Sequence, residues 1–172
     1  ATLGGDSLQK VIVAGVVGTL IIILFMIFYY GALGVFAALS LIVYILFTLA
    51  VFKLIPVTLS LSGLAGFILT IGMAVDANIL IFERIREELK RGLPRAVALE
   101  EGLQRAWPSI RDSNTSTIIT AIILYYFTSS FVRGFALTLL LGVFVSLLSS
   151  ITTTQLFLRV FMQNKKPEQK HV

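Results

Sequence analysis

Long apolar runs alternate with short polar segments along most of the chain. Runs of this length with so few charges are typical of helices that cross a lipid bilayer. At about 1.5 Å per residue, each run can cross a hydrocarbon core about 30 Å thick, the second and fourth only just. The pattern therefore predicts an all-α integral membrane protein with five transmembrane helices, at about residues 11–28, 35–51, 61–82, 116–131 and 135–161.

The composition supports this assignment and excludes several classes of protein. Of the 172 residues, 57% are hydrophobic and only 13% are charged, whereas a soluble domain carries about 25% charged residues. The chain has no cysteine, which rules out a disulfide framework, a thiol nucleophile and a thiolate metal site. It also lacks a catalytic triad, a P-loop and a dinucleotide fingerprint. We therefore expect no enzyme activity, no metal and no organic cofactor.

The basic residues predict the orientation of the helices, because Lys and Arg concentrate on the cytoplasmic side of a membrane. Seven lie in the loop 83–115 and four in residues 159–170, against three elsewhere, namely Lys10, Lys53 and Arg133. The loop and the tail 162–172 are thus predicted to be cytoplasmic, in a multi-pass protein of a bacterial or archaeal plasma membrane. This topology accounts for the net charge of +5 without a nucleic-acid partner.

The same topology places residues 1–10 outside the cell, as a segment that leads into the bundle of residues 11–161. This segment, "ATLGGDSLQK", has no Met, no basic start and no apolar stretch, so it does not resemble a signal peptide. We expect an earlier helix to have carried it across the membrane.

The loop 83–115 is predicted to form a short amphipathic helical hairpin. "ERIREELKRG" continues the third helix beyond the lipid, with opposite charges spaced i,i+4 at Arg84–Glu88 and Glu87–Arg91. Gly92 is a suitable helix stop and Pro94 a suitable start for a second helix. That helix has one apolar stripe, which would lie on the membrane surface or on the bundle, or would dock a cytoplasmic partner: Ala96, Leu99, Leu103 and Ala106.

Asp76 is the candidate functional residue, because it lies inside the apolar part of the third span. An Asp at the centre of a membrane helix costs about 2.5–3.5 kcal/mol to insert, and its short side chain cannot reach far toward water. Protonation, a polar partner or a water-filled cavity would lower this cost. Asp76 is therefore a proton- or ion-coupling carboxylate, a hydrogen-bonded link between helices, or a wet residue in a shallow helix.

Other polar residues near the same depth could support Asp76. Asp112 or Ser113 is expected to cap the start of the fourth helix, which would place the next polar residues along a route from the cytoplasm to Asp76. Caps and interhelical hydrogen bonds are the alternative explanation for these side chains. The possible supporting residues are Asn78, Asp112, Asn114, Thr115 and Thr117.

Three stretches together resemble the SecD/SecF protein-export family of the resistance-nodulation-division superfamily. They are "GMAVDANILIFERIREEL", the spaced pattern "A…EG…RA…SI.DSN.ST.ITAIIL", and "VRGFALTLLLGVFVSL". The first stretch favours the SecD half over the SecF half. The resemblance implies that the five helices belong to a six-helix unit whose first helix and large external domain precede this chain. It also implies that Asp76 is a proton-relay residue and that Asp112 and Asn114 match a family Asp–x–Asn motif.

The resemblance further implies a function and a set of partners. A SecF-like half, separate or fused, would complete the bundle, and the whole would work with the SecYEG channel and, indirectly, the SecA motor. It would use the proton-motive force to assist preprotein translocation, with the preprotein handled by the external domain. The alternatives are a proton-driven exporter of small molecules or lipids, and a non-transporting membrane scaffold in which Asp76 is structural.

Overall fold

A computed structural model describes residues 2–55, 57 and 59–163, and this part of the chain is folded into five α-helices. Most of the predicted tail, residues 164–172, lies outside the described residues. The helices are α1 (Thr2–Tyr30), α2 (Ala32–Leu54), α3 (Leu61–Lys90), α4 (Arg95–Phe127) and α5 (Ser130–Gln163).

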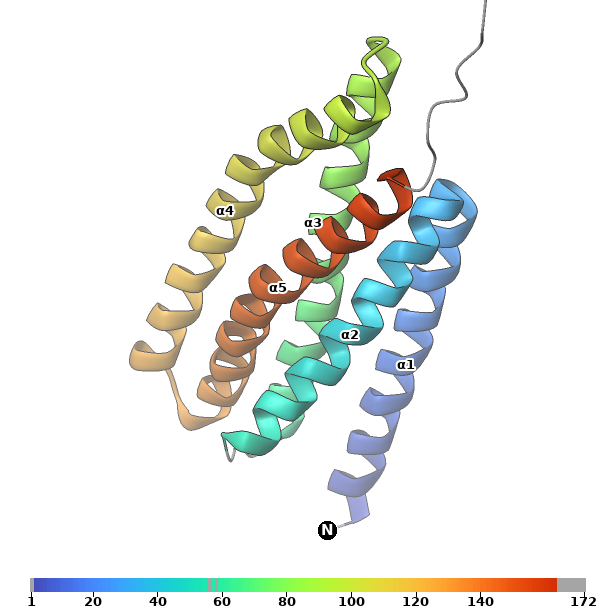
Figure 1. Cartoon of the computed structure of the whole chain (residues 1–172). Helices are drawn as coiled ribbons and strands as arrows, with labels where there is room; N and C mark the ends of the chain where they lie inside the picture. Colours follow the sequence, from blue (N-terminus) through green and yellow to red (C-terminus); the bar gives the residue numbers. More distant parts are fainter. Residues whose placement is uncertain (1, 56, 58, 164–172) are drawn as a thin grey trace, which may run out of the picture.

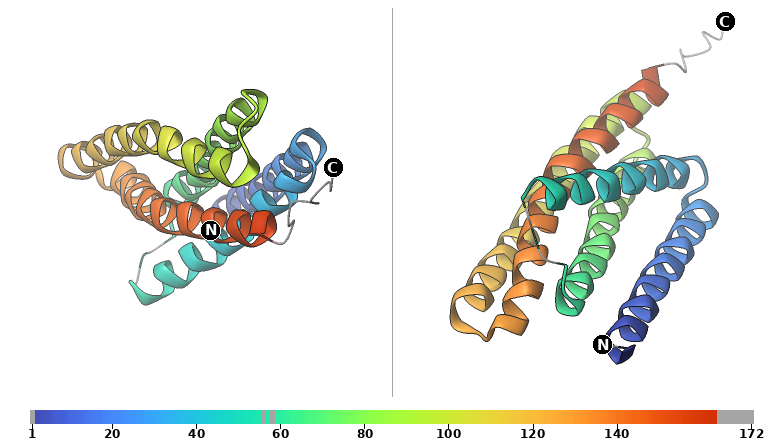
Figure 2. Two further views of the ribbon diagram at one scale, coloured as in Figure 1. Left: turned by 45° about the horizontal axis from the view of Figure 1, so that its top comes forward. Right: turned by 90° about the horizontal axis from the view of Figure 1, so that it is seen from below.

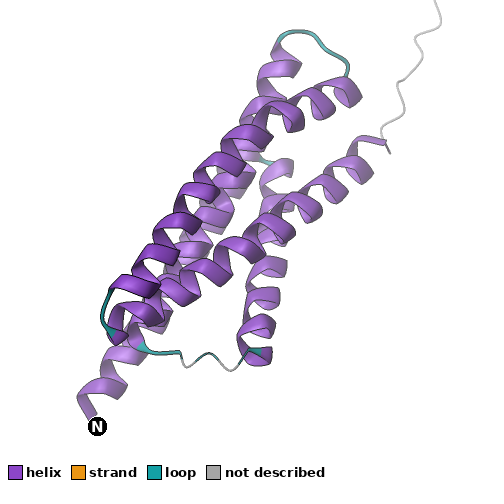
Figure 3. Ribbon diagram, turned by 90° about the vertical axis from the view of Figure 1, so that its left-hand side faces the viewer, coloured by secondary structure: helices purple, strands orange, loops and turns teal. Residues whose placement is uncertain are grey.

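α3 is the central helix of the bundle and contacts each of the other four (Figures 1 and 2). The α1–α2 turn, the α3–α4 turn and the end of α5 lie at one end of the bundle. The start of α1, the α2–α3 connection and the α4–α5 turn lie at the other end (Figures 1 and 3). We call the end with the α3–α4 turn the charged end, because the charged residues on either side of that turn, in 83–91 and 95–105, are located there.

Four of the described helices are long and apolar enough to cross a membrane: those within α1, α2, α3 and α5. The prediction of an all-α membrane protein is therefore confirmed. The predicted fourth span, at 116–131, lies at the end of α4, and the described part of α4 does not reach the same length of apolar sequence because its first half is polar and charged. α3 begins at Leu61, as predicted, whereas α1, α2 and α5 all begin before their predicted spans. Residues 2–10, predicted as a segment leading into the bundle, are the first turns of α1.

α4 is one continuous helix, which corrects the prediction of a short hairpin helix followed by a separate fourth span. Asp112 and Ser113 lie inside it and cannot be its N-cap; the helix starts at Arg95, with Pro94 as the residue before it. Pro108 lies in its interior, and the helix bends between its two halves (Figure 1), as expected where a proline removes a backbone hydrogen bond. The predicted stop at Gly92 is confirmed by its φ of +85°.

The polar side chains in the middle of α4 form hydrogen bonds to the backbone of the same helix. Asn114 Nδ2 donates to Ile110 O at 2.7 Å, and Thr115 Oγ1 donates to Arg111 O at 2.7 Å. Such bonds to the carbonyl four residues earlier satisfy polar groups without ending the helix.

The side of α3 that faces α5 is closely packed by small residues. A Cβ atom on Gly66 would lie 2.7 Å from Phe135 O, so the two backbones nearly touch. Ser62 Oγ donates to Phe131 O at 2.6 Å. α5 is therefore the helix that approaches α3 closely along the small residues Ser62, Gly66 and Thr70.

A buried tyrosine joins three helices at the middle of this packed side. Tyr44 of α2 is fully buried, and its Oη donates to Thr70 Oγ1 of α3 at 2.7 Å. The Tyr44 hydroxyl also lies 3.3 Å from Gly142 O of α5. Since these groups satisfy one another away from lipid, they hold α2, α3 and α5 at a common level.

Candidate functional site

Asp76 lies at the middle of α3 and on its open side. It is the only charged residue between Leu61 and Phe82, and its side chain is exposed in this chain. Asn78, two residues further on, is completely buried. Two residues along an α-helix correspond to a rotation of about 200°, so Asn78 belongs to the packed side of α3 and does not share the surroundings of Asp76.

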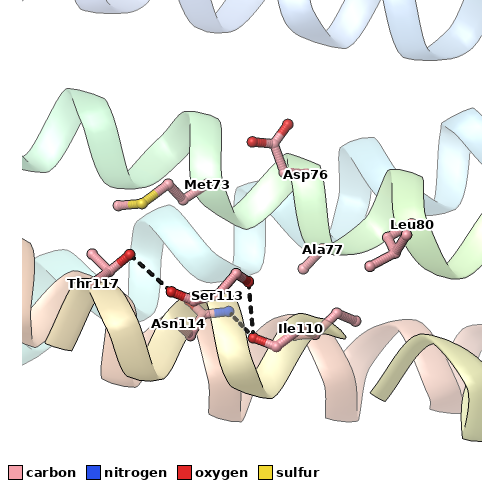
Figure 4. A pocket seen from close by; sticks show the side chains of 8 residues that line it. All are labelled: Met73, Asp76, Ala77, Leu80, Ile110, Ser113, Asn114 and Thr117. Carbon is pink, nitrogen blue, oxygen red and sulfur yellow. Dashed lines mark hydrogen bonds between the residues drawn. The ribbon is translucent and has the colours of Figure 1, made fainter. Parts of the chain in front are cut away.

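A cavity of about 170 Å³ lies between α3 and α4 beside Asp76 (Figure 4). Its α3 wall combines the acid with apolar side chains, and its α4 wall is mostly polar. The lining residues are Met73, Asp76, Ala77, Leu80, Ile110, Ser113, Asn114 and Thr117.

The polar groups of the α4 wall are tied to their own helix. Ser113 Oγ and Asn114 Nδ2 both donate to Ile110 O, at 3.1 and 2.7 Å. Thr117 Oγ1 donates to Ser113 O at 3.1 Å. These bonds fix the orientation of the side chains, while the remaining lone pairs of the hydroxyl groups can accept hydrogen bonds from water in the cavity.

The carboxylate of Asp76 points away from Asn114 and Thr117 (Figure 4). In the described part of the chain, no hydrogen bond or ion pair joins it to another residue. A change in the charge of this carboxylate would therefore break no hydrogen bond or ion pair with the described residues. Its solvation depends on the cavity and on whatever covers the open side of α3.

The structure separates the predicted supporting residues into two groups. Asn114 and Thr117 line the cavity with Asp76, whereas Asp112 and Thr115 are exposed and do not. Asp112 Oδ1 is 2.9 Å from Arg111 Nε and Nη2 instead.

Ser113 also lines the cavity, although the sequence had suggested only a capping role for it. A signal for this position was present, since Ser113 and Thr117 are spaced i,i+4 and so share a helix face. Within the described residues, no group of three or more His, Cys, Asp or Glu side chains could hold a metal ion.

The fold and this site define a class: a multi-pass helical membrane protein with one acid midway along its central helix, beside a partly polar cavity. A family model described as "Protein export membrane protein SecD/SecF, C-terminal" matches residues 1–164. The chain belongs to the SecD/SecF family of protein export membrane proteins.

Individual relatives agree with the family. The chain is 51% identical over 166 residues to the protein translocase subunit SecD of Thermobaculum terrenum, a match that covers 94% of this chain and 32% of that protein. It is 50% identical over 162 residues to SecD of Synechocystis sp., covering 94% and 34%. The chain thus spans about a third of the length of these relatives.

Solved structures show the same arrangement of helices. The crystal structure of SecDF from Thermus thermophilus, described as a translocon-associated membrane protein, has a TM-score of 0.92 and is 38% identical. That match covers 95% of this chain and 23% of the SecDF chain. A second SecDF structure, in the super-membrane-facing form, has a TM-score of 0.89, 37% identity and coverages of 96% and 23%.

Proposed function

We propose that this chain is the membrane part of a SecD-type subunit that uses the proton-motive force to assist preprotein translocation. In this proposal Asp76 is the proton-relay residue. The observation that carries it is an acid at the middle of the central helix, the only charge among residues 61–82, with a cavity beside it. The chain acts as part of a transporter, not as an enzyme, and protons are its coupling ion in place of a cofactor.

The position of Asp76 makes its charge state responsive to proton supply. A charged Asp at the centre of a membrane helix is unfavourable by about 2.5–3.5 kcal/mol, so its charged and neutral forms favour different surroundings. Since each water occupies about 30 Å³ of liquid, the cavity of about 170 Å³ has room for a few water molecules. Water there would connect Asp76 to the polar wall of α4.

The energy of one proton is sufficient for a change of conformation. A charge that crosses a membrane potential of 100 mV releases about 2.3 kcal/mol. That amount changes the ratio of two conformations by a factor of about 50. A protonation cycle at Asp76 would shift the bundle between two packings, and a domain outside this chain would convert the shift into work on the preprotein.

The rest of the proposal concerns orientation and partners. The charged end would be cytoplasmic and the N-terminus external, in the plasma membrane, because most Lys and Arg residues in the described part of the chain lie at the charged end. A SecF-like half would cover the open side of α3 and complete the bundle. The SecYEG channel, and SecA indirectly, would be the working partners; the description of the Thermus neighbour as translocon-associated supports this.

The test is preprotein export by membrane vesicles that contain the full-length protein with Asp76→Asn. This change keeps the size of the side chain and removes its titratable group. We expect export with an imposed proton gradient to fall to the level seen without one, while the complex still assembles. Glu87→Gln is the matched control: it is an acid-to-amide change on the same helix, at an exposed surface pair with Arg84, and such pairs contribute little.

Export that keeps its full dependence on the gradient in the Asp76→Asn protein would overturn the proposal. Asp76 would then be a structural residue of a membrane scaffold, or of a bundle whose proton route lies elsewhere.

A further inference from the structure

Glu88 is a buried acid that the Asp76 site does not use. It lies near the end of α3 with 1% of its surface exposed. Arg91 Nη1 and Arg105 Nη1 lie 3.1 and 3.2 Å from Glu88 Oε1. The expected partner of Glu88 was Arg84, but Arg84 binds Glu87 at 2.9 Å. Arg91 follows α3 directly, so of these two ion pairs the one with Arg105 joins Glu88 to α4.

Burial makes this contact more important than an ordinary surface ion pair. A buried carboxylate is costly unless it is paired and hydrogen-bonded. The arginine side chains remain 56% and 46% exposed, which weakens the electrostatic attraction. Losing Arg105 would nevertheless leave Glu88 with Arg91 alone, and α4 would no longer be bound to it.

The two helices also touch directly next to this pair. A Cβ atom on Gly102 would lie 2.8 Å from the backbone N and Cα atoms of Ile85, so α4 crosses α3 in backbone contact there. Ala98 and Ala106, one turn to either side of Gly102, are fully buried. The stripe that faces α3 thus includes Leu99 and Ala106 as predicted, whereas Ala96 is exposed.

The same alignment of the antiparallel helices α3 and α4 applies at the crossing and at the cavity. Eight residues before Ile85 and eight after Gly102 lie Ala77 and Ile110, which both line the cavity. Four residues further from the crossing, before Ala77 and after Ile110, lie Met73 and Asn114, which line it too. Although α4 bends near Pro108, it continues through that residue as one helix. A shift of α4 along α3 at the crossing would therefore also move the α4 side chains that line the cavity beside Asp76.

We propose that Glu88 and Arg105 are positioning residues for the Asp76 cavity. Their contact, together with the Gly102–Ile85 crossing, fixes the sliding position of α4 on α3. It thereby holds the polar wall of α4 opposite Asp76. The consequence for export depends on the proposed function, whereas the geometric statement does not.

The test measures the register by disulfide formation between Ala77→Cys and Ile110→Cys in the full-length protein, after replacement of any cysteine that lies outside this chain. The rate is followed in membranes after addition of an oxidant, without a proton gradient. We expect Arg105→Gln to lower the rate about tenfold, because a buried charge loses its partner on α4. Arg105→Lys keeps the charge but not the planar fork, and should give an intermediate rate.

Arg111→Gln is the matched control, since Arg111 is exposed on the same helix and pairs with its neighbour Asp112; its rate should equal that of the parent. An unchanged rate in Arg105→Gln would overturn the inference. If the Arg105→Gln protein does not accumulate in the membrane, the cross-linking rate of Arg105→Lys is used instead. A rate equal to that of the parent would then overturn the inference.

Export by the same variants links the register to function. Arg105→Gln should reduce gradient-dependent export and Arg105→Lys should restore part of it. The proposed function of Asp76 and the positioning role of Glu88 and Arg105 can be overturned independently of each other. Normal export by Asp76→Asn would overturn the proposed function and leave the cross-linking result intact, whereas normal cross-linking in Arg105→Gln would overturn only the positioning role.

Discussion

The two sides of α3 differ in how closely other helices of this chain pack against them. On the side that faces α5, Gly66 lies so close to Phe135 that a single added carbon would collide with backbone. On the side that carries Asp76, a Cβ atom on Gly72 would meet nothing within 4 Å. The packed side holds the bundle in one arrangement, and the open side leaves the acid free to change charge and to meet another surface.

The largest effect is expected when the packed side is forced apart by Gly66→Ala. The new methyl group would lie 2.7 Å from Phe135 O, so α3 and α5 would have to separate. Overpacking of this kind costs about 1–3 kcal/mol. The free energy of unfolding of the full-length protein in mixed micelles, measured by titration with a denaturing detergent, should fall by that amount.

The same substitution on the open side is the control. Gly72→Ala lies on the same helix and adds the same group, but into open space. The free energy of unfolding should not fall, because Ala is favoured over Gly in a helix interior by up to about 1 kcal/mol. Equal losses in the two variants would contradict the contrast between the two sides.

A smaller effect is expected from removing one hydroxyl group on the packed side. Tyr44→Phe deletes the donor to Thr70 Oγ1 while keeping the ring. Hydrogen bonds between membrane helices contribute about 0.6 kcal/mol on average and about 1.7 at most, so the unfolding free energy should fall within that range. Tyr126→Phe is the control, because Tyr126 is 70% exposed and should show no loss.

Much of this fold could be predicted from the sequence, because long apolar runs have few alternatives to membrane helices. The start of α3 at Leu61 follows from the start of its apolar run, and its extension to Lys90 follows from the charged helical pattern after Phe82. The continuity of α4 could not be inferred in the same way. Its segment 111–117 has the residues of a helix cap, and only the structure reveals that these side chains bond to their own helix.

The sequence was sufficient to identify Asp76 as the central residue of the site, but not to identify all the side chains that line the cavity beside it. Asp76 stands out because a charge in an apolar run requires an explanation. Its neighbours depend on the rotation of α4: Asn114 and Thr117 share one face, and Asp112 and Thr115 share another. Because the fourth span was predicted to begin near residue 116, the helical spacing of the residues before it was not expected. The register of α4 on α3 depends on tertiary contacts of Gly102 and Glu88, which no local pattern specifies.

The most direct test of the central claim is to ask whether Asp76 takes up a proton in the membrane. Dicyclohexylcarbodiimide modifies protonated carboxyl groups in apolar surroundings, and the modified residue can be identified by mass spectrometry of the full-length protein in vesicles. We expect labelling of Asp76 that decreases as the pH rises and that changes when a proton gradient is imposed, with Asp112 unlabelled. Absence of labelling at Asp76 at every pH, with or without a gradient, would contradict its role as a proton relay.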